Sequence, residues 1–283
     1  MLCHKERRVY RTRETKRGSV IKSMSASPYL YGVLQKYAAR SLTPHSLQIL
    51  QLKTLLTQWS NTCYITTLDS GSRAKGTAIA LASDVDYMVS LKSNCNQNNG
   101  GLKSIYDSLY DKLNGSYRNV RKQNVSVRIN LNGLEVDVTP ARKHTGLTND
   151  HWVYLSKQNT RQQTNVQRHI TDISRSGRTN EIKVLKIWRE LNKLDFPSVY
   201  LEYLLVKNIL AGRSIASDQL APNCWHIFNE LAKGAGNPLL ARVVDPANSA
   251  NILSDLLTVA EKNKIIAQAK VATSQRFWGS IVA

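Results

Sequence analysis

Three aspartates in two predicted strands have the spacing of a metal-binding carboxylate cluster. Asp84 and Asp86 flank a single residue, so on an extended strand both side chains project to the same side. Asp137 lies on the polar face of the later segment Leu134–Thr139, whose apolar residues share the opposite face. If the two strands are neighbours, Asp137 joins the first pair. Three carboxylates form a hard-oxygen site that suits Mg²⁺ and can hold two such ions for phosphoryl transfer.

A Gly-Ser pair precedes this cluster, and eleven residues separate Ser72 from Asp84. Gly71 lets the backbone approach an anion closely, and the Ser72 hydroxyl can donate to a phosphate oxygen at a turn. Two aspartates flanking one residue are by themselves common on the polar face of a half-buried strand. The Gly-Ser pair and the later strand carboxylate together make the pattern specific.

Hydrophobic periodicity supplies the elements that would position these residues. Helical patterns begin at Ser27-Pro28 and at Thr43-Pro44. Asn132-Gly133 is a strong signal for a two-residue hairpin turn between two strands. The other predicted elements before residue 158 are strands at Cys63–Leu68, Ser83–Leu91, Val125–Leu131 and Leu134–Thr139 and a helix at Leu102–Leu113.

Strand signals stop after about residue 158, and only helical patterns follow. The predicted helices are Asn165–Ile173, Asn180–Leu194, Pro197–Leu210, Pro222–Leu231 and Ala250–Gln275. This order predicts a mixed α+β fold with a helical C-terminal half and a cleft between the two halves. We expect a basic extension (1–23), a catalytic domain (24–157) and a helical domain (158–283).

The charge balance indicates an anionic partner, because 39 Lys and Arg stand against 20 Asp and Glu, a net charge of +19. Nucleic acid, a membrane surface and a polyphosphate substrate all fit. No apolar run is long enough to span a membrane, and no secretory signal is evident, so we expect a cytoplasmic protein without a membrane partner. Four widely spaced cysteines predict unpaired thiols in a reducing compartment.

Residues 1–23 carry eight basic and two acidic residues and almost no apolar ones. Three interpretations stay open: a disordered tail, an arm that binds nucleic acid, or a segment that is not native. The third arises because Met24 opens a stretch that looks like a natural protein start. Most of the positive charge lies after this segment.

Gly71-Ser72, Asp84-x-Asp86 and Asp137 resemble the signature of the DNA polymerase β-type nucleotidyltransferase superfamily. Gly76–Ile79 and Val138–Ala141 narrow the resemblance to one branch. That branch contains the oligoadenylate synthases, cyclic GMP–AMP synthase and the bacterial cyclic-oligonucleotide synthases (CD-NTases) of anti-phage defence. The later segments Lys183–Trp188, Pro197–Glu202 and Asp245–Asn251 are also similar to this branch, so the resemblance spans about residues 27 to 270.

The resemblance implies a polymerase β-like core sheet with flanking helices, with the active site in the cleft beside a helical bundle. Asp84 and Asp86 would bind two Mg²⁺ ions, for which Mn²⁺ is an alternative, and Asp137 would bind the ion that activates the attacking hydroxyl. Ser72, next to Gly71, would hold the terminal phosphates. Lys186 and Ser198 would reach the triphosphate from the helical half. Ser198 follows a proline at a predicted helix start, where unpaired N–H groups favour phosphate.

Other polar residues have simpler interpretations. We expect Tyr200 to belong to the core, although it could stack on a base. Asp245-Pro246 is expected to bend the chain, and Asn248 to cap the last helix. The histidines His144, His151, His169 and His226 show no metal-ligand spacing and are interpreted as incidental.

The resemblance implies a magnesium-dependent enzyme that condenses nucleoside triphosphates into a cyclic di- or trinucleotide second messenger. ATP is the expected substrate, the second base stays open, and a downstream effector would respond to the product. The alternative is a linear 2′-5′ oligoadenylate synthase or another terminal nucleotidyltransferase. An inactive binding protein is disfavoured, because the three aspartates and Gly71-Ser72 are intact.

An activating nucleic acid also stays open. No zinc-binding insertion like that of cyclic GMP–AMP synthase is present, but many basic residues could form a surface for a duplex or simply attract triphosphates. They are Lys112, Arg118, Arg121, Lys122, Arg128, Arg142, Lys143, Lys157, Arg161, Arg168, Arg175 and Arg178.

Overall fold

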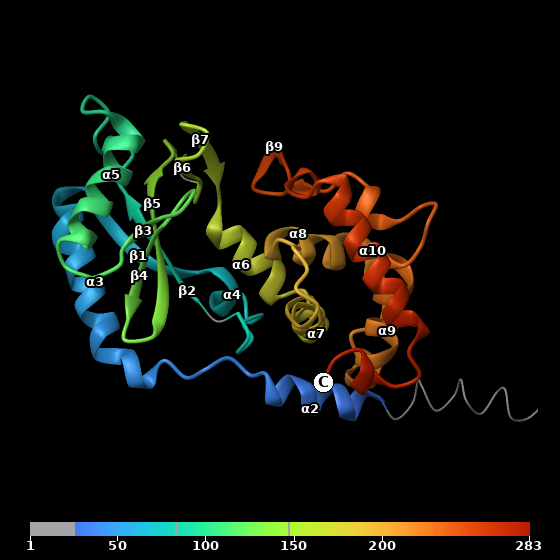
Figure 1. Cartoon of the computed structure of the whole chain (residues 1–283). Helices are drawn as coiled ribbons and strands as arrows, with labels where there is room; N and C mark the ends of the chain where they lie inside the picture. The colour runs from blue at the N-terminus through green and yellow to red at the C-terminus, as the bar shows by residue number, and fades with distance from the viewer. Residues whose placement is uncertain (1–25, 83, 147) are drawn as a thin grey trace, which may run out of the picture.

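The computed structural model describes residues 26–82, 84–146 and 148–283, so the segment 1–23 lies outside the described residues. A sheet flanked by helices lies beside a helical half (Figure 1), which confirms the expected mixed fold. The strands are β1 (Tyr64–Ser70), β2 (Val85–Leu91), β3 (Arg121–Lys122), β4 (Val127–Leu131), β5 (Leu134–Lys143), β6 (His151–Leu155), β7 (Thr160–Thr164), β8 (Val244–Asp245) and β9 (Asn248–Ile252).

The main sheet has the strand order β1-β2-β5-β4-β3, and β6 and β7 extend it from the far end of β5. β2 and β5 pair in parallel, whereas β1 pairs with β2 and β4 pairs with β5 in antiparallel fashion. The two predicted carboxylate strands are therefore neighbours at the centre of the sheet. β8 and β9 form a separate ribbon in the helical half.

The β4–β5 connection is the tight hairpin that the sequence predicts. Asn132 and Gly133 both have positive φ, at 51° and 91°, and Leu131 pairs directly with Leu134. Such angles at both turn residues match the twist of the flanking strands, and Asn-Gly adopts them at little cost. This turn determines which residue of β4 lies opposite each residue of β5.

Nine helices belong to the described part of the chain. They are α2 (Ala26–Lys36), α3 (Ser46–Ser60), α4 (Gly71–Ala74), α5 (Gly101–Asn114), α6 (Val166–Ser174), α7 (Thr179–Leu191), α8 (Ser198–Tyr203), α9 (Leu220–Leu231) and α10 (Val259–Ser274), with a π-helical turn, Leu204–Ile209, directly after α8.

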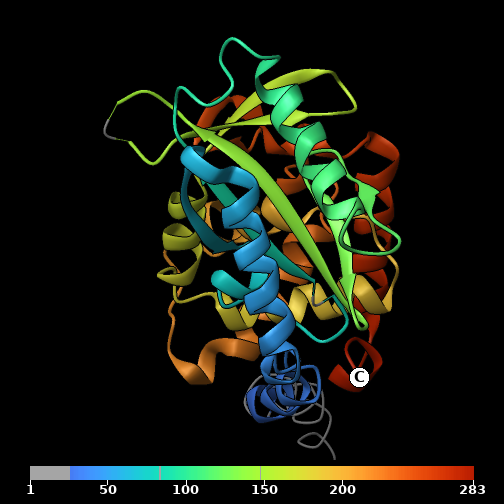
Figure 2. The same ribbon diagram turned by 90° about the vertical axis from the view of Figure 1, so that its left-hand side faces the viewer.

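Helices α3 and α5 cover one face of the sheet, as Figure 2 shows. Leu56 of α3 and Leu109 of α5 are fully buried in one cluster with Val136 and Val138 of β5. The alternation of β5 explains this arrangement, because its apolar residues face the helices while Glu135 and Asp137 are only partly buried and face away from them. The carboxylates thus lie on the sheet face that is turned toward the helical half.

A second core holds the helical half together, and α2 belongs to it although it comes first in the chain. Leu30 and Val33 of α2 are buried with Trp188 of α7 and Phe228 of α9. Figure 1 shows α2 beneath α7 and α9, with the chain then crossing to α3 on the other side of the molecule. The stretch of chain from α2 to α3 therefore connects the two halves.

Two expectations about the C-terminal half are wrong. Strands do not stop at residue 158, because β7 pairs with β6 along its whole length, and the boundary expected at 157 falls in the turn between them. The last helix does not begin at residue 250, where β9 lies. α10 begins at Val259, and Thr258 and Glu261 form a capping box at its start. All five residues of β7 are polar, so the sequence gives no strand signal there, and pairing with β6 overrides this.

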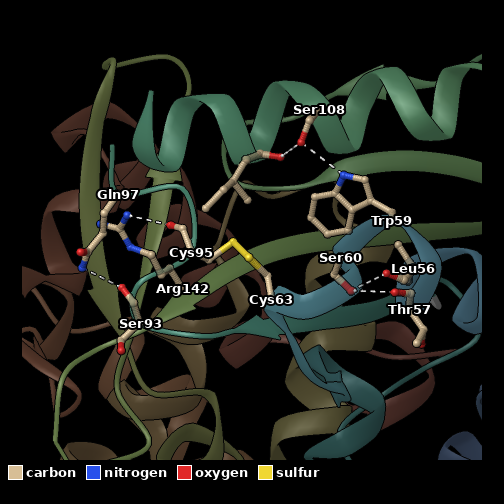
Figure 3. The surroundings of a disulfide bond; sticks show 11 residues. Leu56, Thr57, Trp59, Ser60, Cys63, Ser93, Cys95, Gln97, Ser108 and Arg142 are labelled. Atoms are coloured by element: carbon tan, nitrogen blue, oxygen red, sulfur yellow. Dashed lines mark hydrogen bonds between the residues drawn. A yellow bond between two sulfur atoms is a disulfide. The ribbon is translucent and has the colours of Figure 1, made fainter. Parts of the chain in front are cut away.

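The expectation of unpaired thiols is also wrong for Cys63 and Cys95, which form a disulfide (Figure 3). Cys63 directly precedes β1 and Cys95 follows β2, and the antiparallel pairing of these strands brings their Cα atoms to 5.6 Å. Cys224 is free and buried. Within the described ranges, no helix combines the length and the hydropathy that a membrane crossing requires.

Candidate active site

The three predicted carboxylates converge because of strand register. Asp86 of β2 pairs directly with Asp137 of the parallel strand β5. Asp84 immediately precedes β2 and lies two positions from Asp86, so it shares the same side of the chain. The structure thus brings together residues that are separated by some fifty positions in the sequence.

Gly71 is packed against Asp86. A Cβ atom at Gly71 would lie 1.8 Å from Asp86 Oδ2, and the backbone φ of +65° is one that residues with side chains rarely adopt. Two constraints therefore require glycine at position 71: the positive φ of the backbone and the close contact with Asp86. Ser70, the preceding residue, pairs with Asp86 in the β1–β2 ladder.

An arginine also joins the cluster. Arg128 of β4 lies opposite Asp137 and donates to both of its carboxylate oxygens, from Nε at 2.9 Å and from Nη2 at 2.6 Å. The same Nη2 lies 2.8 Å from Asp84 Oδ2, and Nη1 lies 2.9 Å from Glu135 Oε2. Glu135 is also bonded to Arg121 at 2.8 Å. One guanidinium therefore connects three carboxylates.

The electrostatics of the cluster are those of an anionic site with too few cations. Burial and, to a lesser degree, the neighbouring charges of Asp137 and Asp84 together raise the pKa of Asp86 to about 6. Burial also raises the pKa of Asp84, against the opposing effect of Arg128. Hydrogen bonds to Asp137 are the main cause that raises the pKa of Arg128. Asp86, which Arg128 does not bond, is the least compensated of the three.

The chemistry of these donors fits a hard divalent cation, but the described arrangement is not a preassembled metal site. Carboxylate oxygens are the ligands that Mg²⁺ prefers, and a bound cation would offset the burial and the repulsion from Asp137 and Asp84 that raise the pKa of Asp86. In residues 26–82, 84–146 and 148–283, no three Asp, Glu, His or Cys side chains are grouped so that they could hold a metal ion. Arg128 accounts for part of this, since it engages Asp84 and Asp137.

Ser72 and Lys75 extend the site toward the helical half. Within the described part of the chain, no hydrogen bond engages the Ser72 hydroxyl, although its carbonyl accepts from the Thr77 backbone N–H at 2.8 Å. Lys75 Nζ lies 2.8 Å from Glu202 Oε2, and its charge opposes the upward pKa shift of Asp86. The sequence patterns alone did not point to Lys75.

Lys186 and Ser198 have protein partners in the structure. Lys186 is 2% exposed and its Nζ lies 2.7 Å from Glu202 Oε1 and 3.0 Å from Thr77 Oγ1. Ser198 Oγ accepts from Arg189 Nη1 at 3.0 Å. Neither residue reaches the three aspartates, whereas Tyr200 is core as expected, with no exposed surface.

Glu202 joins the two halves through these contacts. Burial alone would raise its pKa, but the ammonium groups of Lys75 and Lys186 outweigh burial and lower the pKa to about 2. Lys75 and Thr77 follow the Gly-Ser turn, and Lys186 and Glu202 belong to α7 and α8. The buried ion cluster therefore attaches the Gly71-Ser72 turn to the helical half.

A cavity of about 430 Å³ lies between the halves beside this cluster. Ser70, Lys75 and Thr139 line it from the sheet side, and His169 and Asp245 line it from the helical side. A second cavity, of about 480 Å³, borders Asp84 and Glu135. The second cavity thus borders the carboxylates directly, whereas the first is lined by Thr139, two positions after Asp137 on β5.

The segment around Asp245 has one of its two expected roles, because Asp245-Pro246 bends the chain at the turn between the antiparallel strands β8 and β9. Asn248 does not cap the last helix, since it lies in β9 and donates to the Gln163 carbonyl at 3.2 Å. Asp245 accepts from His169 Nε2 at 2.7 Å and from Asn251 at 2.9 Å. His169 is therefore not incidental, because its bond to Asp245 orders one wall of the first cavity.

The expected basic surface is only partly available to a partner. Arg128 lies in the carboxylate cluster, and Arg178 is 5% exposed and bonded to Glu181. Arg121 is paired with Glu135 and Lys122 with Asp107, and Arg161 lies over the Trp152 ring at 4.5 Å.

Comparison with known proteins gives a sequence relative and several structural neighbours. No protein family model matches the chain. The cyclic AMP-AMP-AMP synthase of Escherichia coli (strain MS 115-1) is 26% identical over 234 residues, which cover 70% of this chain and 72% of the synthase.

Two solved structures are similar over nearly the whole chain. CdnC of E. coli MS115-1, solved in complex with HORMA-deltaN, has a TM-score of 0.68 at 20% identity, covering 89% of this chain and 90% of that one. The CD-NTase CdnG of Bradyrhizobium diazoefficiens, solved in complex with GTP, has a TM-score of 0.67 at 11% identity, covering 88% and 92%. At these identities the structures establish the shared fold, that of CD-NTases, and the expected superfamily is confirmed.

Proposed function

We propose that this chain, a member of the nucleotidyltransferase superfamily, condenses nucleoside triphosphates into a cyclic di- or trinucleotide second messenger that acts in anti-phage signalling. One observation carries the proposal: Asp86 and Asp137 pair in register on parallel strands, with Asp84 alongside and Gly71 packed on Asp86. The similarity to a cyclic AMP-AMP-AMP synthase supports a cyclic product and ATP as one substrate.

In the proposed reaction, a 2′- or 3′-hydroxyl of one nucleotide attacks the α-phosphate of another, and pyrophosphate leaves. Asp84, Asp86 and Asp137 would hold up to two Mg²⁺ or Mn²⁺ ions, with Asp137 at the ion nearest the attacking hydroxyl. Such ions would stabilise the charge that develops on the phosphoryl oxygens. The protein's own task is to hold the hydroxyl and the α-phosphate in line, and ring closure repeats this reaction on the linear product.

The Gly71-Ser72 turn is proposed to bind the terminal phosphates, because the Ser72 hydroxyl is not engaged by the described residues. Lys75 already lines the cavity beside this turn. The triphosphate contacts proposed for Lys186 and Ser198 require each to exchange its present partner, Glu202 or Arg189, for phosphate.

The remaining parts of the proposal concern the setting of the reaction. We propose that residues 24–157 form the catalytic unit and 158–283 the helical unit, apart from β7, which belongs to the sheet of the first, and α2, which packs in the core of the second. The cytoplasm is the proposed location because nucleoside triphosphates are available there. A downstream effector would read the product, and a nucleic acid or a regulatory protein would control the enzyme. CdnC is known in complex with HORMA-deltaN, which supports a protein regulator.

The test is incubation of the full chain with ATP, GTP, CTP and UTP and Mg²⁺, followed by mass analysis before and after phosphatase treatment. A cyclic product resists phosphatase because it has no terminal phosphate. A phosphatase-sensitive ladder would instead identify a linear 2′-5′ oligoadenylate synthase or another terminal nucleotidyltransferase.

Asp84→Ala combined with Asp86→Ala should abolish all product while the fold survives, because removing clustered carboxylates relieves repulsion. Asp111→Ala is the matched control, since Asp111 is an exposed carboxylate on α5. Turnover retained by the double variant would exclude the proposed site.

A further inference from the structure

The Arg128 guanidinium lies among the carboxylates that the proposed function assigns to metal. It bonds both oxygens of Asp137 and one oxygen of Asp84, at distances of 2.6 to 2.9 Å. The side chain of Arg128 is 22% exposed and that of Asp137 is 14% exposed, so this pair is shielded from solvent more than surface ion pairs are, whereas the Asp84 side chain is 42% exposed. Asp86 is the one proposed ligand that Arg128 does not bond.

We propose that Arg128 is an internal counter-cation that competes with a divalent metal ion for Asp84 and Asp137, and that Glu135 retains its guanidinium when metal binds. This inference rests on the proposed function, because it takes Asp84 and Asp137 as metal ligands. It assigns to Arg128 a positioning role, since the residue acts through the carboxylates.

The geometry favours such a competition. A guanidinium presents paired N–H groups in a rigid fork that fits a carboxylate, so Arg128 holds Asp137 by two bonds and keeps the anionic cluster assembled. A metal ion needs oxygen atoms that these N–H groups now occupy. A ligand that binds the same atoms lowers the apparent affinity of its competitor, so Arg128 should weaken metal binding.

Glu135 gives the guanidinium a second position. It bonds Nη1 of Arg128 at 2.9 Å, and its side chain is 36% exposed at the outer edge of the cluster. Glu135 also bonds Arg121, which keeps the carboxylate in place near Arg128. Release of Asp84 and Asp137 therefore leaves Arg128 with an anionic partner, which lowers the cost of its displacement.

A purely structural ion pair makes a different prediction. If Arg128 only stabilises the fold, its removal lowers the unfolding temperature equally with and without metal and leaves metal affinity unchanged or weaker. If Arg128 competes, its removal tightens metal binding and makes metal more stabilising. Metal affinity without nucleotide separates the two, and it requires no turnover.

The experiment is a Mn²⁺ titration of the nucleotide-free full chain, followed by electron paramagnetic resonance and by calorimetry. The variants are Arg128→Met, which keeps the length and removes the charge, Arg128→Lys, which keeps the charge and removes the fork, and Glu135→Gln. Asp86→Asn identifies the signal that belongs to the site, and thermal unfolding with and without Mn²⁺ is recorded for each variant.

Arg128→Met should bind Mn²⁺ about tenfold more tightly than the wild type and gain more thermal stability from it. Arg128→Lys should lie between the two. Glu135→Gln should weaken binding in the wild type, and this loss should be much smaller in the Arg128→Met background, because the two residues are coupled.

Equal or weaker Mn²⁺ binding by folded Arg128→Met would overturn this inference alone, provided that the wild type binds Mn²⁺ and Asp86→Asn does not. If Arg128→Met does not fold, Arg128→Lys decides, and binding no tighter than the wild type overturns the inference. A wild-type chain that binds no Mn²⁺ in an Asp86-dependent manner would overturn the proposed metal site as well.

Discussion

Gly71 and Asp86 are in contact so close that no larger residue fits at position 71. A Cβ there would lie 1.8 Å from Asp86 Oδ2 and 2.8 Å from Asp86 Cβ. Real Cβ atoms do not approach so closely, so either the α4 turn or the Asp86 side chain would have to move. The Gly71-Ser72 turn and the Asp86 carboxylate are therefore positioned against each other.

Gly71→Ala should reduce product formation by about a hundredfold or more, since small displacements of reacting groups have effects of that size. Gly212→Ala is the matched control, because Gly212 has a similar φ of +72° and a Cβ added there would meet no atom within 4 Å. Both variants should lose about 1 kcal/mol or more of unfolding free energy from the backbone conformation. Equal activity in the two would show that the contact with Asp86 is unimportant.

Metal binding should weaken at acidic pH because protons compete for Asp86. Its pKa of about 6 lies above the ordinary value of 3.8, so the carboxyl is increasingly protonated as pH falls below 6. The apparent Mn²⁺ affinity should therefore fall by up to about tenfold per pH unit between pH 6 and 5. The stability of the metal-free chain should depend on pH in the opposite direction. Because the pKa of Asp86 is raised in the folded state, the free energy of unfolding should fall as pH rises from about 4 to 6.

Calorimetric titrations with Mn²⁺ from pH 5 to 8, together with urea unfolding of the metal-free chain, measure both effects. Asp86→Asn should remove this part of the pH dependence from each. A Mn²⁺ affinity that is constant across this range would contradict the assignment of Asp86 as a metal ligand.

Glu202→Gln should destabilise the protein by about 3 to 5 kcal/mol, since it leaves Lys75 and Lys186 buried without a full countercharge. Glu230→Gln is the control, because Glu230 pairs with Lys233 at the surface, where such a pair contributes about 1 kcal/mol or less. Urea unfolding at pH 7 gives both values.

The same residue predicts acid sensitivity. The folded-state pKa of Glu202 is about 2, below the ordinary 4.5, so its contribution is present above pH 4.5 and is lost as pH falls toward 2. The difference in unfolding free energy between wild type and Glu202→Gln should therefore shrink over this range. A constant difference would mean that Glu202 is not held ionised by the two lysines.

Turnover by nuclease-treated protein should not require nucleic acid, because several of the expected basic residues are already paired or buried. Arg121 and Lys122 are paired with Glu135 and Asp107, and Arg178 is buried. Salt should then act mildly, by screening the approach of triphosphates. Assays with and without duplex DNA or RNA at two salt concentrations decide this, and stimulation of about tenfold that falls steeply with salt would indicate counterion release on a duplex.

Local patterns in the sequence determined which faces of the central strands carry the carboxylates and where the β4–β5 turn lies. Alternation along a strand placed Asp84 and Asp86 on one side and separated Asp137 from the apolar face of β5. Asn132-Gly133 determined a two-residue turn, and this turn also sets Arg128 opposite Asp137. In the sequence Arg128 looks like one of many surface cations. The register of the hairpin nevertheless places it opposite Asp137.

Only the tertiary structure decided which distant elements meet. The parallel pairing of β2 with β5 puts Asp86 beside Asp137, and the packing of the two halves buries Lys186 against Glu202. The bond between Cys63 and Cys95 likewise depends on the β1–β2 pairing. Hydrophobic periodicity shows which face of a helix or strand is apolar, because that face is determined by residues that are close together in the sequence. Contacts between elements depend instead on strand order and on how two cores pack, and no short stretch of sequence carries that information.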